Sequence, residues 1–326
     1  QVLFGQACGR TSVYQVGFSF AAANHSQLAP FSIADKGQAA MTSDLQNAQL
    51  TPVREQLRLN VRHWPGEGRP FVLLHGLASN SLTWAAVARH LQAAGHAVYA
   101  VDQRGHGHSD KPDEGYDCGT VTEDLDLLCD RLGLVRPIVA GQSWGGNVVL
   151  EFGARYPQRA AGLVLVDGGF LDLQARPDVT WEKIADQLRP PPLAGTPRTA
   201  MRQRLATFHP DWTEEGIDDT MGNYEVMPDD TIRPWLTLDR HMRILRSLWD
   251  QRPPQLYVQV EVPVLIAAAE DAGNPEWMAV KHRQVAAAAA LLPRVEVHWF
   301  GDTAHDIHVH RPEALAELML EWSRGL

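Results

Sequence analysis

One serine stands among glycines in the stretch "GQSWGG" (141–146), and this spacing is the first feature of the sequence that could carry chemistry. A β-branched, apolar run precedes Ser143, and an apolar, helix-like run follows it. A residue on such a strand-to-helix turn projects from the end of a sheet, and small neighbours such as Gly141 and Gly145 permit the strained backbone. Ser143 is therefore a candidate nucleophile, and a polar residue in a tight turn is the plainer alternative.

A serine hydroxyl attacks a carbonyl only when a base removes its proton, and the base needs a carboxylate that holds its tautomer and stabilises its charge. Two later loops offer these groups. Asp271 follows the predicted strand "VPVLIAAA" (262–269), and His305 lies after the predicted strand "VEVHWF" (295–300). The three residues occur in the order Ser143, Asp271, His305, each just past the carboxyl end of a predicted strand.

The elements that must position these residues alternate between strand and helix from residue 54 onward. Short apolar runs predict strands, and the helical spacing of Trp84, Val87 and Leu91 predicts a helix. Thr120 and Glu123 in capping-box spacing predict the start of another helix. A further helix is predicted to start at Pro312. The predicted strands are 54–64 (an antiparallel edge strand), 71–74, 97–102, 137–141, 162–167, 262–269 and 295–300. This order predicts an α/β fold whose mostly parallel sheet is flanked by helices.

The alternation stops between about 168 and 258, where proline-rich turns and helical pieces replace it. Strands resume directly afterwards, so we interpret this segment as a helical cap (lid) over the carboxyl edge of the sheet, with an independent helical domain as the alternative. The expected organisation is an N-terminal extension at 1–52, an α/β core at 53–167 and 259–326, and the cap at 168–258. The cap carries six aromatic side chains: Trp181, Phe208, Trp212, Tyr224, Trp235 and Trp249.

Composition and charge argue against several classes of protein. The chain has 326 residues, 44% hydrophobic and 21% charged, and can bury a large core. Its net charge of -10, without a Lys/Arg cluster, repels phosphate backbones, so no nucleic acid partner is expected. No apolar run reaches the roughly 18 to 20 residues of a membrane span. Cys8, Cys118 and Cys129 lack metal-ligand spacing and suit a reducing compartment.

The first forty residues are weakly patterned. Arg10 and the short run "VGFSFAAA" (16–23) resemble a secretion signal only faintly, because polar residues interrupt the apolar part. Met41 offers an alternative natural start, which would make residues 1–40 an upstream extension. We therefore expect a cytoplasmic protein, with secretion as the alternative.

Several ordered motifs together resemble the α/β-hydrolase superfamily, over roughly residues 54–326. They are "HGLASNSLTW" after the strand at 71–74, "DQRGHGHSDKP" after the strand at 97–102, "GQSWGG" at the turn, a late acidic loop, and "TAHDIHVHRPE" before the final helix. The resemblance is to a capped, serine esterase-like member. It implies that Ser143 is the nucleophile and His305 the base.

The resemblance also implies an oxyanion hole formed by the backbone N–H groups of Leu77 and Trp144. One departure affects the acid: many relatives carry Gly three residues before it, and this chain has Ala268 there. Asp271 remains the preferred acid. Glu270 and Asp167, at the end of the preceding strand, stay open as rivals.

Other conspicuous polar residues are interpreted as structural. His308 and His310 lie near His305, but no Cys or carboxylate pattern completes a metal-ligand set, so no metal and no cofactor are expected. We expect His75 to orient the oxyanion loop. Asp102, Arg104 and Ser109 are expected to brace that end of the sheet by hydrogen bonds.

The trailing Trp-Gly-Gly of the turn is similar to that of epoxide hydrolases and haloalkane dehalogenases, which carry aspartate where Ser143 stands. An aspartate attacks an alkyl carbon, whereas a serine attacks a carbonyl and forms an acyl-enzyme. Serine therefore favours acyl transfer to water. Relatives resembling proline iminopeptidase carry a His-Gly-Gly-Pro-Gly run that "HGLAS" lacks.

We therefore predict a carboxylic ester hydrolase for small to medium apolar substrates. Carbon–carbon bond, lactone, amide or perhydrolase chemistry on the same fold is the alternative, and a hydrolase-fold ligand receptor is an alternative of another class. The expected partner is a small-molecule ester, and the expected state is a monomer or homodimer.

Overall fold

The computed structural model describes residues 47–175, 179–271, 273 and 275–326. The expectations for residues 1–46, including the faint secretion signal and the start at Met41, lie outside the described residues. Within the described ranges, no helix combines the length and the apolar character needed to cross a membrane.

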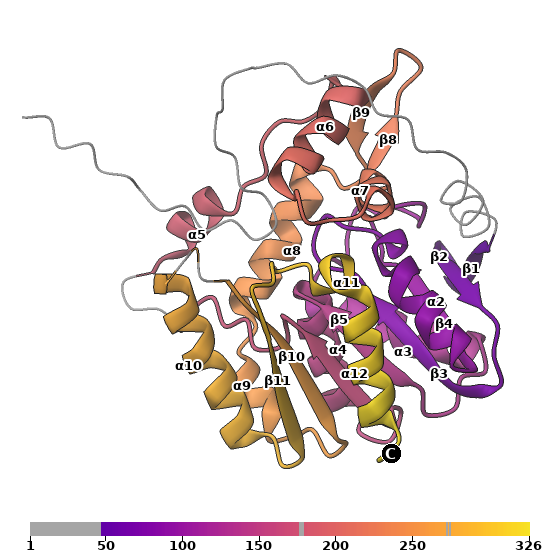
Figure 1. Cartoon of the computed structure of the whole chain (residues 1–326), viewed down its shortest axis with the longest axis vertical. Helices are drawn as coiled ribbons and strands as arrows, with labels where there is room; N and C mark the ends of the chain where they lie inside the picture. The colour runs from indigo at the N-terminus through magenta and orange to yellow at the C-terminus, as the bar shows by residue number, and fades with distance from the viewer. Residues whose placement is uncertain (1–46, 176–178, 272, 274) are drawn as a thin grey trace, which may run out of the picture.

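An eight-stranded sheet forms the centre of the molecule (Figure 1). Its first strands form an antiparallel edge, and the strands from β4 through β3, β5, β6, β10 and β11 run parallel. The spatial order is β1 (Ala48–Arg54), β2 (Leu57–Trp64), β4 (His96–Asp102), β3 (Gly68–Leu74), β5 (Ile138–Gln142), β6 (Gly162–Val166), β10 (Val264–Glu270) and β11 (Val295–Gly301). The predicted mostly parallel α/β sheet is thereby confirmed.

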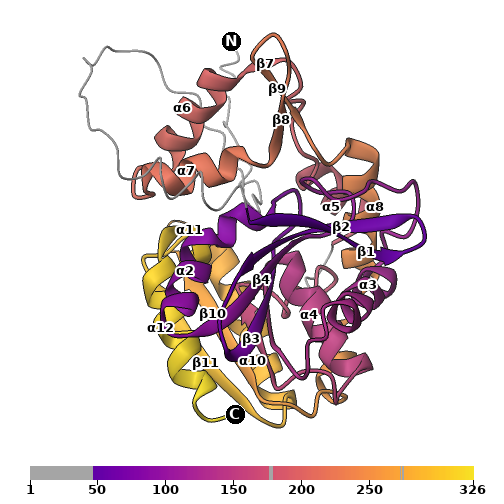
Figure 2. The same cartoon turned by 90° about the vertical axis from the view of Figure 1, so that its right-hand side faces the viewer.

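Helices cover both faces of this sheet, as the alternating pattern predicts. Figure 2 shows α2 (Ala85–Ala93) and α12 (Pro312–Ser323) on one side and α3 (Cys118–Arg131) and α4 (Trp144–Arg155) on the other. Along β3, Phe71 packs on the α2 side and Val72 on the α4 side. Both side chains are fully buried, which explains why this strand reads as a continuous apolar run.

Two predicted boundaries are wrong. Residues 48–52, assigned to the N-terminal extension, belong to β1, which pairs with β2 in the core sheet. The helix predicted to start with a capping box at Thr120 starts at Cys118 instead, and Asp117 is its N-cap: the Asp117 side chain accepts a hydrogen bond from Thr120 N–H at 2.9 Å. Asp is as good a cap as Thr, so the two patterns compete within three residues.

The inserted segment lies over the carboxyl end of the sheet in both views (Figures 1 and 2). It is not purely helical, because a three-stranded antiparallel sheet stands among its helices. Its elements are α5 (Trp181–Gln187), β7 (Thr196–Pro197), α6 (Arg198–Phe208), α7 (Glu214–Met221), β8 (Tyr224–Val226), β9 (Thr231–Pro234), α8 (Leu238–Asp250) and α9 (Pro253–Tyr257). The remaining elements are η1 (Ser81–Trp84), α10 (Pro275–Leu291) and α11 (Ile307–His310).

Glycines permit the close approach of three backbone segments at the end of β5. A Cβ on Gly141 would overlap the carbonyl of Gly145, and a Cβ on Gly145 would lie 2.5 Å from the His75 carbonyl oxygen. A Cβ on Gly168 would overlap the backbone of Ser143. Residues with side chains would push these segments apart, because a packed interior has no space to accept the added atoms.

We expect Gly168→Ala to lower the free energy of unfolding by about 2 kcal/mol through overpacking against the Ser143 backbone. Gly301→Ala is the matched control, because Gly301 lies at the end of another strand of the same sheet and a Cβ there would meet no atom within 4 Å. Denaturant unfolding followed by circular dichroism measures both. Equal stabilities of the two variants would contradict the packing argument.

Candidate active site

Ser143 lies on a sharp turn between β5 and α4, in a conformation that few non-glycine residues adopt. Its backbone angles are φ 53° and ψ -122°. Its N–H donates to the Val166 carbonyl at 2.9 Å, and its carbonyl accepts from Gly146 N–H at 2.9 Å. Such strain is tolerated where the surrounding structure enforces it, and here the neighbouring strand and the first turn of α4 both hold the residue. The structure thus places Ser143 on the predicted strand–turn–helix.

His305 follows β11 and reaches back to the end of β6. Its Nδ1 lies 2.7 Å from Oδ2 of Asp167. Asp167 is buried, with 1% of its side chain exposed, and itself has a positive φ of 41°. The structure therefore pairs the predicted base with one of the two rival carboxylates.

Asp271, the preferred acid of the sequence, does not occupy this position. Its side chain is exposed, and its Oδ1 accepts a hydrogen bond from Gly273 N–H at 2.8 Å. Glu270 lies 3.4 Å from His282 Nε2 and is about half exposed. The expectation that Asp271 holds His305 is wrong for this structure, because the loop after β10 turns its carboxylate into a local turn while the end of β6 points at the imidazole.

The Asp167 carboxylate receives hydrogen bonds from three elements. Lys281 Nζ, on α10, lies 2.9 Å from Oδ1 and 2.7 Å from Oδ2, and Ala269 N–H, on β10, donates to Oδ1 at 2.9 Å. Burial alone would raise the pKa of Asp167, but the charges and hydrogen bonds of Lys281 and His305 hold that pKa below its usual value. Asp167 is consequently an ionised, buried carboxylate.

The tautomer of His305 follows from this pairing. An ionised carboxylate only accepts hydrogen bonds, so Nδ1 of His305 carries a proton and Nε2 of the neutral ring carries a lone pair. That Nε2 atom is buried and has no hydrogen-bond partner among the described residues. His305 therefore presents a free basic nitrogen within the cavity that it lines together with Ser143.

The loop after β3 forms the opposite wall of this cavity with Gly76, Leu77 and Ala78. Ala78 has a positive φ of 62°, and its N–H donates to Nε2 of His106 at 3.2 Å. Trp144 is the first residue of α4. N–H groups in the first turn of a helix have no acceptor within the helix and carry the positive end of its dipole.

Two neutral histidines hold the loop in place. His75 Nε2 accepts from Gln103 N–H at 3.1 Å, which leaves its Nδ1 to donate to the Gly76 carbonyl at 2.7 Å. Burial lowers the pKa of His75, and burial lowers that of His106 well below the usual value. The predicted orienting role of His75 matches these contacts.

The residues expected to brace this end of the sheet do so. Asp102 accepts hydrogen bonds from Ser81 N–H at 2.7 Å and His108 N–H at 2.9 Å. The hydroxyl of Ser109 donates to the Asp102 carbonyl at 2.5 Å, and Arg104 forms a buried ion pair with Asp124 at 2.5 Å. None of the three side chains of Asp102, Arg104 and Ser109 lines the cavity that contains Ser143.

The cavity at Ser143 is small and has a mixed polar and apolar lining. Its volume is about 60 Å³. Residues of the inserted segment and of the α/β core both line it. The lining residues are Gly76, Leu77, Ala78, Ser79, Thr83, Gln142, Ser143, Leu205, His209, Trp212, Thr220, Asn223, His305, Asp306 and Val309.

Most of the cap's six aromatic side chains lie away from this cavity. Of the six, only Trp212 lines it, stacked on His209 with ring centroids 3.8 Å apart. Trp181 packs against Trp249, with ring centroids 6.3 Å apart. Trp235 packs against His108 instead. Most of these side chains therefore pack away from Ser143, and the lining of the cavity combines hydroxyl, amide and imidazole groups with apolar side chains such as Leu205 and Val309.

The histidines near His305 lie in separate environments. His308 is fully buried against Thr83, 3.2 Å from its hydroxyl, and burial lowers the pKa of His308 to about 3. His310 Nδ1 accepts a hydrogen bond from Ala304 N–H at 3.3 Å. Within the described part of the chain, no three His, Cys, Asp or Glu side chains are grouped so that they could hold a metal ion.

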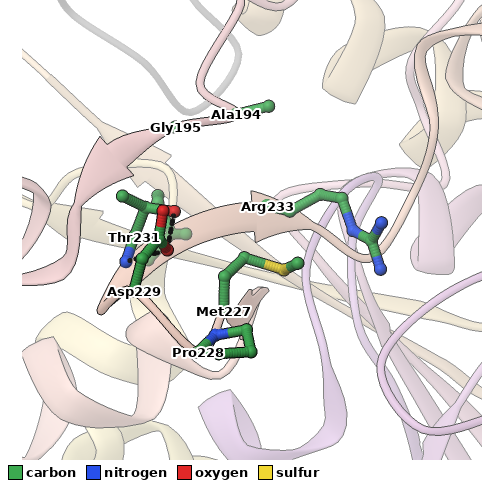
Figure 3. A pocket seen from close by; sticks show the side chains of 8 residues that line it. Ala194, Gly195, Met227, Pro228, Asp229, Thr231 and Arg233 are labelled. Atoms are coloured by element: carbon green, nitrogen blue, oxygen red, sulfur yellow. Dashed lines mark hydrogen bonds between the residues drawn. The ribbon is translucent and has the colours of Figure 1, made fainter.

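A second hollow, of about 350 Å³, lies on the cap sheet (Figure 3). Its polar side chains bond to near neighbours: Asp229 accepts from the Thr231 hydroxyl at 2.7 Å, and Arg233 binds Glu225. No histidine, serine or cysteine is among the described residues that line it. The pairing of a nucleophile with a base is therefore found at Ser143 and not at this hollow.

Sequence reasoning did not identify Lys281, His209 or Asp306 as part of the site. Lys281 left a signal: in α10 it shares the buried face with Met278, Val285 and Ala288, at spacings of three, four and seven residues. A lysine on an apolar stripe must find a buried anion, because an isolated buried charge is costly. His209 and Asp306 left no comparable signal.

Curated relatives match about a third of this chain. A 2-(acetamidomethylene)succinate hydrolase from Mesorhizobium japonicum is 34% identical over 34% of this chain and 40% of its own length. A putative non-heme haloperoxidase of Mycobacterium phage D29 is 36% identical over 31% of this chain and 37% of its own. The chain spans only 30% to 40% of the curated relatives that it matches.

Solved structures resemble the chain over most of its length. The crystal structure of an E-2-(acetamidomethylene)succinate hydrolase superposes with a TM-score of 0.67 at 23% identity, over 85% of this chain and 98% of that one. An esterase from Exiguobacterium antarcticum gives 0.61 at 18% identity, over 82% and 96%. A meta-cleavage product hydrolase gives 0.63 at 19% identity, over 86% and 100%. At these identities the similarity shows the fold alone.

A family model described as the alpha/beta hydrolase fold matches residues 69–312. That match extends from β3 through the cap to the start of α12, and it includes Ser143, Asp167 and His305. The chain belongs to the alpha/beta hydrolase family.

Proposed function

We propose that the protein is a serine hydrolase that cleaves carboxylic esters through an acyl-enzyme. One observation carries this proposal: His305, with Nδ1 bonded to the buried carboxylate of Asp167 and Nε2 free, lines the same small cavity as Ser143 on its strained turn. A nucleophile, a base and a carboxylate that orients the base are the groups that acyl transfer requires.

In the proposed reaction, the Ser143 hydroxyl oxygen attacks the ester carbonyl carbon while His305 Nε2 takes the hydroxyl proton. The carbonyl π electrons move to oxygen, and the N–H groups of Leu77 and Trp144 stabilise the resulting oxyanion. The intermediate collapses, and His305 returns the proton to the departing alcohol. Water then attacks the acyl-enzyme in the same way, giving the carboxylic acid and free Ser143.

Asp167, not Asp271, is the acid in this proposal. Its carboxylate fixes the Nδ1–H tautomer of His305 and lies where the imidazolium charge develops. Asp271 is exposed and engaged in its own turn, so water and the local N–H already satisfy it. A screened surface carboxylate contributes little to the energy of a charge elsewhere.

The dimensions of the cavity favour a short acyl group. A volume of about 60 Å³ is well below the roughly 300 to 1,000 Å³ of pockets that hold drug-sized ligands. Hydroxyl and amide groups of Ser79, Thr83, Thr220 and Asn223 line it, so a compact substrate with hydrogen-bonding atoms suits it better than a long alkyl chain. This narrows the sequence-based expectation of small to medium apolar esters.

Carbon–carbon bond hydrolysis is the alternative, because it also needs a serine, a base and an oxyanion site. A panel of simple esters distinguishes the two. Turnover of activated short esters with burst kinetics supports the ester hydrolase, whereas Ser143 labelling without ester turnover favours the alternative.

We expect Ser143→Ala to reduce hydrolysis of p-nitrophenyl acetate by a factor on the order of 10³ or more, because the nucleophile is lost. Circular dichroism and Tm show whether the fold is retained. Thr83→Ala, which alters a neighbouring hydroxyl of the cavity, is the matched control and keeps measurable turnover. Retention of more than about a tenth of the activity by Ser143→Ala would rule out Ser143 as the nucleophile.

Asp167→Asn should lower kcat roughly 10³-fold, because an amide does not stabilise the imidazolium and permits the wrong tautomer. Asp271→Asn should stay within about twofold of the parent, since its carboxylate is exposed. Both variants are compared by kcat/KM for p-nitrophenyl acetate. A larger loss for Asp271→Asn would reassign the acid to the loop after β10.

The ratio of kcat/KM for p-nitrophenyl butyrate to that for the palmitate should be at least about 10, given the small cavity. Trp212→Ala should shift this preference toward longer chains, because Trp212 closes the cavity from the cap. Trp181→Ala removes a cap tryptophan that packs elsewhere and should leave the ratio unchanged. A parent that prefers palmitate would refute the size argument.

A further inference from the structure

We propose that Lys281 is a positioning residue for the Asp167–His305 pair, and that its charge sets how readily His305 is protonated. The inference rests on the proposed function, since it concerns the same site. It adds a fourth ionisable group, on α10, to the three that acyl transfer requires. Lys281 does not contact the cavity that holds Ser143 and acts only through Asp167.

The ammonium group of Lys281 donates hydrogen bonds to three oxygen atoms. Its Nζ donates to Oδ1 of Asp167 at 2.9 Å, to Oδ2 at 2.7 Å and to the carbonyl of Ala269 at 2.9 Å. An ammonium group has three donors, and these contacts use all of them. Ala269 N–H in turn donates to Oδ1 of the same carboxylate at 2.9 Å. Lys281 therefore fixes the rotation of the Asp167 carboxylate that turns Oδ2 toward His305.

Because Lys281 is buried, its charge acts strongly on Asp167 and on His305 beside it. Only 3% of the Lys281 side chain and 1% of the Asp167 side chain are exposed, so water screens this pair weakly. Two effects act on His305 in opposite directions. The Asp167 carboxylate favours the protonated imidazole, and the nearby ammonium of Lys281 partly cancels that preference.

Other groups also face the pair. Asp306, adjacent to His305, is half-buried; burial and the charge of Asp167 raise its pKa, whereas the charges of His305 and His209 oppose that rise. His308 also lies near His305, and its low pKa, about 3, keeps it neutral. Lys281 is a buried cation in contact with Asp167, and its positive charge acts against protonation of His305.

Lys281→Met removes the charge while keeping a similar volume. The probe is a fluorophosphonate, which reacts with a base-activated serine, and its rate of attachment to Ser143 is measured between about pH 5 and pH 9. The pH profile of kcat/KM for p-nitrophenyl acetate is recorded in parallel. We expect the fall in rate on the acid side of both profiles to move upward by about one pH unit or more, because His305, beside an Asp167 carboxylate that Lys281 no longer neutralises, then retains its proton to higher pH. The loss at low pH should appear in kcat more than in KM.

Three variants accompany this one. Lys281→Arg keeps the charge and should restore the acid side of the parental pH profile, even if its larger head group lowers kcat. Lys281→Gln keeps a hydrogen-bond donor for Asp167 but not the charge, so the acid side of its pH profile should move as in Lys281→Met. This variant replaces Lys281→Met in the test if the methionine variant does not fold. Gln284→Met removes another buried side chain of α10, one that donates to the Asp172 carbonyl. This variant should be less stable than the parent, while the acid side of its pH profile should not move.

The role of Lys281 is overturned if the acid side of the pH profile stays in place in both Lys281→Met and Lys281→Gln. If the parent protein still labels at Ser143, the proposed function stands. An equal shift in Gln284→Met also overturns the role of Lys281, because the shift would then reflect general loosening of α10. Failure of the parent protein to label at Ser143 overturns the proposed function, and with it this inference.

Discussion

A carboxylate taken out of water has to be neutralised by the groups around it, and the carboxyl end of this sheet is arranged to do that for Asp167. An isolated buried charge is so unfavourable that the group would otherwise protonate. Here Lys281 contributes a charge, Ala269 a backbone N–H, and His305 a ring N–H. These donors come from α10, β10 and the loop after β11, so one anion holds together segments that are far apart in the sequence.

The backbones at the ends of β5, β6 and β10 approach one another closely beside Asp167. Ser143 N–H bonds to the Val166 carbonyl, and the Asp167 N–H bonds to the Ala267 carbonyl at 2.7 Å. Strands β5, β6 and β10 thus end together, and Gly168 leaves room for the backbone of Ser143. Positive φ angles at both Ser143 and Asp167 turn their side chains out of the sheet at this edge. The backbone contacts that pack the strand ends together therefore also place Ser143 and Asp167 at the edge of the sheet.

Most of the fold could be predicted from local pattern, because buried parallel strands are apolar runs and their helices repeat at helical spacing. The turn at Ser143 and the position of His305 were also predictable, since each follows such a strand. The acid was not, because three carboxylates end neighbouring strands and sequence spacing says nothing about which one points at the imidazole. Asp167 bonds to Lys281, 114 residues later, and sequence spacing alone does not show that these two residues meet.

The cap shows a second limit of sequence reasoning. Aromatic side chains such as its tryptophans stabilise a small inserted unit as readily as they bind substrate. Only tertiary packing decides between these uses, and here it places Trp181 against Trp249 and leaves Trp212 at the cavity. The polar part of the lining comes from residues such as Thr220 and Asn223, which are unremarkable in the sequence.

The hydrogen bond between His305 Nδ1 and Asp167 tests the central claim most directly, and low-field proton NMR detects it. A proton in a short, charge-assisted N–H···O bond to a buried carboxylate resonates at unusually low field and exchanges slowly. The account predicts such a resonance in the parent protein, its persistence when Asp271 is replaced by Asn, and its loss when Asp167 is replaced by Asn. Loss of the resonance in the Asp271 variant, with its persistence in the Asp167 variant, would contradict the account.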